Sequence, residues 1–477
     1  MLETIVNRCV DEVKEKLATW ETELAANLDF SALEKALAEV LHRLATSVLE
    51  PLLQKQLADT GYLERLKRLG ARWALRFKEY RTITVRLFNG HVITVASPYF
   101  TKARAKHRGR KRNRYRGSHL GLEVLGLLGR CSRHLVSQVV QLALLCPSFA
   151  VAQAVLAERW ITMDVKTLRR LCAVVGQLGI ELRGPVSLDG TEVLDGHILV
   201  IGIDGGRVRE RTKKRGRKKA GQKRAGYHTE WREPKLFTIY LLDAEGNVVK
   251  DFAPLHDATM GKDDEMFALL ERYLAALDLT KLARIVFCGD GALWIWSRVE
   301  RLITRRGFDP QRIDQVIDYT HAKQNLWAMA ELVPGTPAER QRTYEEWKAW
   351  LWQGDMAGLY EAINRTLIGK RLRQAQRKWK NYFDKNAARM QYQRFKESHI
   401  PCGSGCVESA IRRVINLRLK AAGSFWTRAM AECFLFLRSQ LLSGRWTIFL
   451  NNVTRRRIVA AGNALETSPL QNERKAA

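Results

Sequence analysis

The sequence predicts an α/β protein: a mixed β-sheet flanked by helices, with a helical N-terminal region and a helical insertion. Hydrophobic residues recur at helical spacing over the first eighty residues. From about residue 193, short apolar runs begin, first three joined by hairpins and then others separated by amphipathic helices. Hairpins join antiparallel strands and helical crossovers join parallel ones, so the sheet should be mixed and covered on both faces.

The N-terminal region, residues 1–80, is predicted to be helical because apolar side chains share one helix face. At residues 82–88 (TITVRLF) and 91–95 (HVITV) the apolar period changes to that of strands. The Asn89-Gly90 pair between these runs favours a β-hairpin, because both residues tolerate positive φ. The helical face comprises Leu33, Leu37, Val40, Leu41 and Leu44.

A strongly basic segment, residues 102–116, follows this hairpin, and the two together form the predicted region 81–125. More than half of the segment is Lys or Arg. It is either a solvated, flexible arm or a set of ordered phosphate contacts, and the sequence leaves both readings open. Its candidate DNA-binding residues are Lys102, Arg104, Arg108, Arg110, Lys111 and Arg112.

Residues 126–183 are expected to be helical. Residues 148–176 predict two short helices with a turn near residues 160–164. This arrangement is compatible with a DNA-binding helix-turn-helix, and equally with a plain helical pair. In the first case Lys166 and Arg169 would contact DNA.

The α/β part begins at about residue 184. An apolar run at residues 197–203 ends at Asp204, and another at 283–289 ends at Asp290. The remaining elements are a hairpin of residues 236–243 and 248–255, helices 263–278 and 292–307, a strand 314–320 that ends near Asp318, and a helix 321–333. The first part of this region (184–335) is followed by a polar, Trp-rich helical insertion (336–396), closing helices (397–446) and a tail (447–477).

Asp204 and Asp290 both follow buried strands, and each is followed by glycine. Sites in open α/β sheets form at the carboxyl ends of strands. Two carboxylates on neighbouring strands repel each other unless a cation lies between them, and Mg²⁺ prefers such oxygen ligands. Each aspartate alone is also compatible with a turn residue. A third acid is then expected, and the candidate is Glu408, which follows a glycine-rich turn. Alternatively, Glu408 is a first-turn glutamate that only complements the dipole of its helix.

The motifs IGIDGG, CGDGALWIW, DYTHA and GSGCVES, followed by RLKAAGSFW, resemble those of insertion-sequence DDE transposases of the Kra-type group, over residues 184–446. The resemblance implies an RNase H-like catalytic domain. It also implies that Asp204, Asp290 and Glu408 are the catalytic, metal-binding acids, and that Asp318 and His321 support them. Relatives often carry cysteine pairs after the N-terminal hairpin, and this chain does not.

The resemblance further implies that Mg²⁺ (or Mn²⁺) is the cofactor and that two ions, about 3.5–4 Å apart, would clamp a scissile phosphate. The implied partners are double-stranded DNA, both the terminal inverted repeats of the element and the target, and a second copy of the chain in a homodimer. From the residues alone, three converging acids indicate only metal-dependent phosphodiester chemistry.

The charge balance also predicts a polyanionic partner. Of the 477 residues, 80 are Lys or Arg and 50 are Asp or Glu, a formal net charge of +30. Each cation placed on a phosphate releases condensed counterions. Tyr227 and Trp231 would either stack on opened bases or pack in the core, with core packing favoured. Near the proposed acids, the candidate DNA contacts are Lys213, Lys214, Arg215, Arg217 and Lys218, and Arg412, Arg418 and Lys420.

Other classes find no support in the sequence. No Walker A, HExxH or G-x-S-x-G motif occurs. No apolar run reaches the ~18 residues of a membrane span, and no signal peptide is recognised, so a cytoplasmic, nucleoid-associated protein is expected. A metal site at His399, Cys402 and Cys406 lacks an evident fourth ligand. Two alternatives stay open, an RNase H-like nuclease that only cleaves and a non-catalytic DNA-binding protein derived from a transposase.

Overall fold

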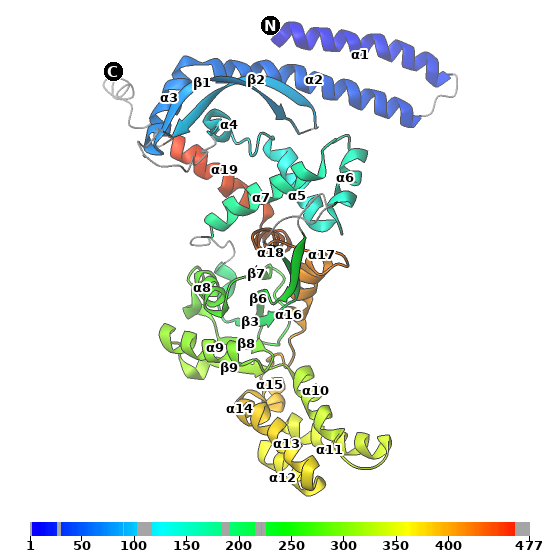
Figure 1. Cartoon of the computed structure of the whole chain (residues 1–477), viewed down its shortest axis with the longest axis vertical. Helices are drawn as coiled ribbons and strands as arrows, with labels where there is room; N and C mark the ends of the chain where they lie inside the picture. The colour runs from blue at the N-terminus through cyan, green and yellow to red at the C-terminus, as the bar shows by residue number, and fades with distance from the viewer. Residues whose placement is uncertain are drawn as a thin grey trace. The chain divides into compact units, whose positions relative to one another are not determined.

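The computed structural model describes residues 2–25, 30–88, 90–102, 117–183, 191–214, 221 and 226–462. The chain divides into two compact units (Figure 1). Unit 1 comprises Met1–Leu178 and Thr447–Ala477, and unit 2 comprises Gly179–Trp446. None of the described helices combines the length and apolar character that a membrane span requires.

Unit 1 is built on a long helical hairpin and a β-hairpin. The helices α1 (Leu2–Ala25) and α2 (Phe30–Ala58) pack against each other, and α2 also packs on β2. Strands β1 (Leu75–Arg86) and β2 (Val92–Lys102) pair antiparallel, which confirms the predicted hairpin and lengthens it. The helical N-terminal region therefore ends before residue 80. The remaining helices are α3 (Thr60–Arg72), α4 (Leu120–Val124), α5 (Arg133–Leu145), α6 (Phe149–Glu158), α7 (Val165–Glu181) and α19 (Trp446–Gly462).

Helices α6 and α7 are the two short helices that the sequence predicts. Asp164 begins α7, where its carboxylate accepts the backbone N–H of Thr167 at 2.8 Å. Lys166 and Arg169 lie on the exposed face of α7. They are therefore accessible to a partner, as a DNA-binding role would require.

Unit 2 contains a five-stranded mixed sheet in the order β7-β6-β3-β8-β9, which confirms the predicted sheet class. The central strand β3 pairs antiparallel with β6 and parallel with β8, and β8 pairs parallel with β9. Asp204 and Asp290 thus belong to neighbouring strands, as the sequence indicates. The strands are β3 (Ile198–Gly205), β6 (Lys235–Leu242), β7 (Leu255–Thr259), β8 (Arg284–Gly289) and β9 (Ile313–Ile317).

Strand β7, the third strand of the sheet in chain order, lies later in the sequence than predicted. Of the predicted run 248–255, Val248 makes an isolated bridge with Leu242, and only Leu255 belongs to a strand of the sheet. The Asp243 carboxylate accepts the N–H groups of residues 245 and 247 and closes a tight turn. Pro254 cannot donate to a ladder, and β7 begins at the residue after it.

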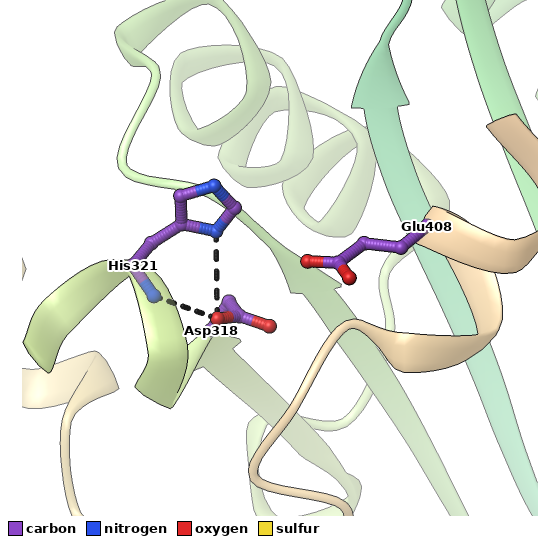
Figure 2. A group of neighbouring side chains, drawn as sticks. All are labelled: Asp318, His321 and Glu408. Carbon is purple, nitrogen blue, oxygen red and sulfur yellow. Dashed lines mark hydrogen bonds and ion pairs between the residues drawn. The ribbon is translucent and has the colours of Figure 1, made fainter. Parts of the chain in front are cut away.

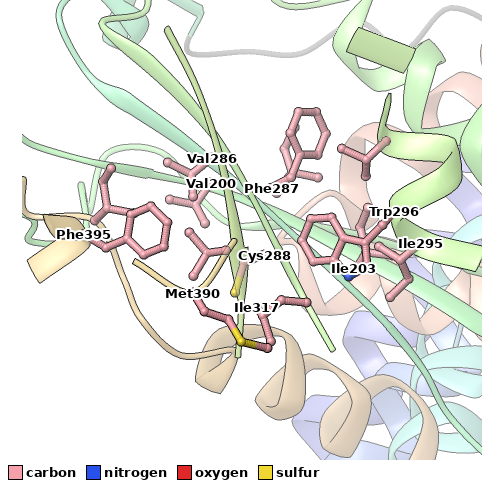
Figure 3. Close-up of a cluster of buried hydrophobic side chains, with 14 of the residues drawn as sticks. Val200, Ile203, Val286, Phe287, Cys288, Ile295, Trp296, Ile317, Met390 and Phe395 are labelled. Carbon is pink, nitrogen blue, oxygen red and sulfur yellow. The ribbon is translucent and has the colours of Figure 1, made fainter. Parts of the chain in front are cut away.

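Helices flank the sheet and share its core. Val200, Val286 and Ile317 of the sheet lie in one buried cluster with Trp296 of α9 (Leu293–Arg306) (Figure 3). Met390 and Phe395, from the end of the helical insertion, belong to the same cluster. The insertion is helical, as predicted, and comprises α11 (Pro337–Gln353), α12 (Met356–Thr366), α13 (Gly369–Asn381), α14 (Phe383–Asn386) and α15 (Tyr392–Glu397).

After the insertion the chain returns to the sheet through one continuous helical run. It consists of α16 (Gly405–Ala410), a π-helical segment (Ile411–Asn416) and α17 (Leu417–Leu419). Helix α16 packs on β3 and β6. The other helices of this unit are α8 (Asp263–Leu274), α10 (Tyr319–Ala330) and α18 (Arg428–Leu442).

A second hairpin, which the sequence pattern does not predict, contains the candidate DNA contact Lys213 at the end of its first strand. Strand β4 (Val208–Lys213) pairs antiparallel with β5 (Tyr227–Arg232). Several predicted DNA contacts lie outside the described residues, namely Arg104, Arg108, Arg110, Lys111, Arg112, Arg215, Arg217 and Lys218.

Candidate active site

Three neighbouring parallel strands end on aspartates. Asp204 is the penultimate residue of β3, Asp290 follows β8, and Asp318 follows β9. Because the carboxyl ends of parallel strands meet at one edge of a sheet, this edge collects three carboxylates. The edge is the place where the sequence predicts a site.

Glycines in β3 and directly after it allow the helical run that carries Glu408 to come close to this strand. A Cβ atom at Gly202 would lie 2.9 Å from Cβ of Val407, and one at Gly206 would lie 2.6 Å from Cδ1 of Ile415. Side chains two residues apart on a strand share a face, so Asp204 lies on the face of Gly202 that α16 covers. Glu408, next to Val407, is thereby held near this carboxyl edge.

Asp318 connects α10 with α16. Its Oδ1 atom accepts the backbone N–H of His321 at 2.8 Å and lies 3.4 Å from the His321 Nδ1 atom (Figure 2). Its Oδ2 atom accepts hydrogen bonds from the backbone N–H and the hydroxyl of Ser404. The Ser404 hydroxyl also lies 3.3 Å from Oε1 of Glu408. Both oxygens of Asp318 are therefore engaged by the protein.

Asp318, His321 and Glu408 form the tightest group of metal-ligand side chains among the described residues. One ligand atom of each lies within 4.8 Å of the others, and in Figure 2 the three side chains converge from α10 and α16. Two carboxylates and an imidazole are ligands that Mn²⁺ or Zn²⁺ accepts, whereas Mg²⁺ prefers oxygen. This group shares only Glu408 with the predicted set of metal-binding acids.

Asp204 lies within electrostatic range of this group. Burial raises the pKa of Asp204 to about 6, and the charges of Asp290 and Glu408 add to the rise. His321 acts in the opposite direction on the Asp204 carboxyl. A carboxyl with this pKa among other acids is stabilised by a proton or by a bound cation.

The pKa values of Asp318 and His321 move apart. Burial raises the pKa of Asp318, but contacts with His321 and Ser404 outweigh burial and hold it well below its ordinary value. The contact with Asp318 raises the pKa of His321 despite burial, and the charges of Asp290 and Asp204 contribute. Together these shifts favour an ion pair beside the carboxylates.

Asp290 is positioned by its own loop and by the insertion. Its Oδ1 atom accepts the N–H of Ala292 at 2.9 Å, and its backbone carbonyl accepts the indole N–H of Trp296 at 2.6 Å. A Cβ atom at Gly291 would lie 2.2 Å from the ring of Tyr382. The glycine after Asp290 therefore admits an aromatic side chain from the insertion.

Sequence reasoning missed two residues at this site. Ser404 stands in the glycine-rich turn before Glu408, and its place in that turn was the available signal. Tyr382 lies in the insertion, and no sequence pattern indicates that it contacts the loop of Asp290. Asp290 and Asp318 influence the Tyr382 hydroxyl, whose pKa is raised mainly by burial.

Two expectations about the surroundings of the site need correction. Arg418 is buried, with its guanidinium over the rings of Trp426 and Phe434, so it is not exposed to DNA. Tyr227 and Trp231 are exposed and do not pack in the core. The remaining described candidates are exposed, namely Lys102, Lys213, Lys214, Arg412 and Lys420.

The three residues considered as an additional metal site do not form one in the described part of the chain. The Cys402 thiol donates to the carbonyl of Tyr392 at 3.4 Å, and Cys406 is exposed. His399, Cys402 and Cys406 do not come together as a metal-ligand group among the described residues.

Comparison of this chain with protein-family models, curated proteins and solved structures finds no match.

Proposed function

We propose that this protein is a metal-dependent DDE transposase with an RNase H-like catalytic domain, which cleaves DNA at element ends and joins them to target DNA. The observation that carries the proposal is the gathering of Asp204, Asp290 and Glu408 at one sheet edge, with the pKa of Asp204 raised by burial and by the other two acids. A sheet whose central strand has one antiparallel and one parallel neighbour is compatible with the implied fold.

The residues of the proposed site have different roles. Asp204, Asp290 and Glu408 would hold divalent cations, Mg²⁺ or Mn²⁺. In the described part of the chain, the Oδ2 atoms of Asp204 and Asp290 accept no hydrogen bond, whereas Oδ1 of each is fixed by its own loop. Bound cations would activate water or a 3′-hydroxyl and stabilise the leaving oxygen.

Asp318 and His321 are proposed to support the three acids. The oxygens of Asp318 already accept hydrogen bonds from α10 and from the α16 turn, so Asp318 fixes the two elements relative to each other. The raised pKa of His321 favours its protonated form, which would place positive charge beside Asp204 and Asp290. That charge lowers the repulsion between the acidic site and an incoming phosphate.

The exposed cations near the site support a DNA substrate. Arg412 and Arg413 are exposed and follow Glu408 on the same helical run, and Lys213 and Lys214 follow Asp204 at the end of β4. Each cation that neutralises a phosphate contributes affinity that falls with salt. Two element ends must be processed together, and we therefore propose that the protein acts as a homodimer.

The decisive experiment is a DNA cleavage and joining assay with Mg²⁺ or Mn²⁺ and DNA that carries the element ends. We expect Asp290→Asn and Glu408→Gln each to lower the rate by at least about 10²-fold, because each removes a charge that the reaction requires. Glu361→Gln, at an exposed acid of α12 that pairs with Arg365, is the matched control and should retain full activity.

The assay also separates the alternatives. Cleavage without joining would replace the transposase proposal with a nuclease that only cleaves. Products that are unchanged in Asp290→Asn would contradict catalysis at this edge. DNA binding without any product would leave a non-catalytic DNA-binding protein.

A further inference from the structure

The β4–β5 hairpin lies directly after the first candidate catalytic acid. Arg209, in β4, is five residues from Asp204, so their Cα atoms are at most ~18 Å apart. The hairpin is fixed to the segment after α17: the N–H of Arg211 donates to the carbonyl of Trp426 at 2.7 Å, and the N–H of Trp426 donates to the carbonyl of Arg209 at 2.9 Å. Its position near the site is therefore set by backbone hydrogen bonds.

The two faces of this hairpin differ in chemistry. Side chains alternate along a strand, and the register pairs Arg209 with Trp231 and Lys213 with Tyr227. One face thus carries three cations, two aromatic rings and no acid. The opposite face carries Glu210 and Glu230, which both pair with Arg232.

On the acid-free face, guanidinium groups and rings alternate. The Arg209 guanidinium lies 4.7 Å from the ring centroid of Trp231 and 5.7 Å from that of Phe425. Phe425 lies 5.6 Å from the ring of Tyr227, which Arg211 approaches at 6.0 Å. We call Arg209, Arg211, Tyr227, Phe425 and Trp231 the stacking platform.

The rings of the platform remain accessible. Trp231 is 49% exposed and Tyr227 is 46% exposed, although the hairpin is anchored through the buried side chains of Val208 and Trp426. Exposed rings on a fixed, cationic surface can stack on a ligand while the cations attract its negative charge. A ligand that suits them has a flat π-face and a negative backbone, which is the chemistry of an unpaired nucleotide.

We propose that the stacking platform binds unpaired bases of the DNA strand whose phosphate is held at Asp204, Asp290 and Glu408. The rings of Trp231 and Tyr227 stack on the bases, and Arg209, Arg211 and Lys213 contact the phosphates. Fully paired DNA offers the platform only its backbone, because its bases are stacked within the duplex. This inference depends on the proposed function for the identity of the ligand, DNA, but not on catalysis.

The test uses the full-length Asp290→Asn protein in EDTA, so that no DNA is cut. Two DNAs are compared, a duplex with a short unpaired stretch containing 2-aminopurine and the same duplex fully paired. We expect quenching of 2-aminopurine only in the unpaired DNA. Trp231→Ala and Tyr227→Ala, made separately, should each weaken binding of that DNA by roughly 5- to 150-fold and leave binding of the paired DNA unchanged.

Two further variants serve as controls for the binding test. Trp231→Phe keeps a ring and should retain most of the binding, and Trp350→Ala, an exposed tryptophan of α11, should bind both DNAs like the parent. Equal loss on both DNAs, or no loss on either, would overturn the stacking proposal. The cleavage assay is independent of this binding test. If the wild-type protein cuts DNA but Trp231→Ala causes no selective loss of binding, only the platform proposal is overturned. If Trp231→Ala causes the selective loss but the wild-type protein never cuts DNA, only the catalytic proposal is overturned.

Discussion

Gly202 decides how closely the helix that carries Glu408 approaches β3. A Cβ atom at this position would meet Cβ of Val407 at 2.9 Å and Cγ2 of Thr238 at 3.1 Å, and neither neighbour is the end of a flexible side chain. We expect Gly202→Ala to lower the free energy of unfolding by about 1–3 kcal/mol. It should also lower the cleavage rate, since α16 must move away from Asp204.

Urea denaturation and the cleavage assay measure the two effects. Gly405→Ala is the matched control, because a Cβ atom there meets nothing within 4 Å. It should be neutral in both measurements. A Gly202→Ala protein as stable and active as wild type would show that α16 does not need this close approach.

Asp204 should make the metal-free protein less stable as the pH rises. Its pKa is about 6 in the folded chain, raised mainly by burial, and about 4 when unfolded. Between these values the folded state binds more protons than the unfolded state. The free energy of unfolding therefore falls as the pH rises from about 4 to about 6.

Asp204→Asn removes this linkage. In EDTA the variant should be more stable than wild type above pH 6, by up to about 3 kcal/mol, and should show no gain near pH 4. Urea denaturation of both proteins across this range measures the difference. A variant less stable than wild type at pH 7 would argue against a raised pKa of Asp204 in the folded chain.

The strand-ending acids could be predicted from the sequence because a strand, its last residue and the following glycine are adjacent in the chain. Ser404 and Tyr382 could not be assigned, since their contacts with Asp318 and the loop of Asp290 join segments distant in the sequence. Arg418 was predicted to contact DNA from its charge alone. Its burial between Trp426 and Phe434 depends on how the segment after α17 folds back.

Element α13 is the most cationic described helix of the insertion, and it offers a test of DNA binding. It carries no acid, and its Lys and Arg side chains are exposed and make no ion pair with described residues. If duplex DNA contacts this helix, replacing Lys370, Arg373, Arg377 and Lys380 with Gln should weaken binding. The slope of log K against log salt should flatten by about 0.9 for each lost phosphate contact.

A charge-conserving set, with each Lys of the four changed to Arg and each Arg to Lys, controls for changes in structure. It should keep both the affinity and the salt slope near wild type. If the Gln variant keeps the wild-type slope, the DNA path does not cross α13. Fluorescence anisotropy over a series of salt concentrations measures both quantities.

At the scale of elements, the local spacing of apolar residues predicts most helices and the strands β3, β6, β8 and β9. This spacing does not predict elements whose formation depends on tertiary contacts. The β4–β5 hairpin was missed because its strand β4 is half basic and lacks apolar alternation, yet it forms against Trp426. The sequence pattern places strand β7 too early, because the apolar run 248–255 is interrupted by a turn at residues 249–252 and by Pro254.

At the scale of the whole molecule, the mixed sheet could be predicted, because hairpins and helical crossovers fix strand direction. The packing of the insertion could not. Met390 and Phe395 complete the core of the sheet, and no local signal in a polar, Trp-rich segment indicates such a role. The insertion is therefore part of the core of unit 2, and Tyr382 connects it with the loop of Asp290.

The division into two units with separate hydrophobic cores predicts two unfolding transitions, of which only one responds to metal. Three of the thirteen tryptophans, Trp20, Trp73 and Trp160, lie in unit 1, so tryptophan fluorescence reports mainly on unit 2. Mn²⁺ at 100 times its dissociation constant should stabilise unit 2 by about 2.7 kcal/mol and raise the midpoint of the fluorescence transition. Far-UV circular dichroism should show a second, unshifted transition from the helices of unit 1.

Glu408→Gln identifies the site responsible, because Glu408 belongs both to the predicted acids and to the group with Asp318 and His321. It should abolish the Mn²⁺-dependent shift, and Glu361→Gln should retain it. His321→Gln then separates the two ligand sets: a retained shift favours cations held by Asp204, Asp290 and Glu408, whereas a lost shift favours the group of Asp318, His321 and Glu408. A fluorescence transition that Mn²⁺ does not move in the wild-type protein would contradict metal binding by either set.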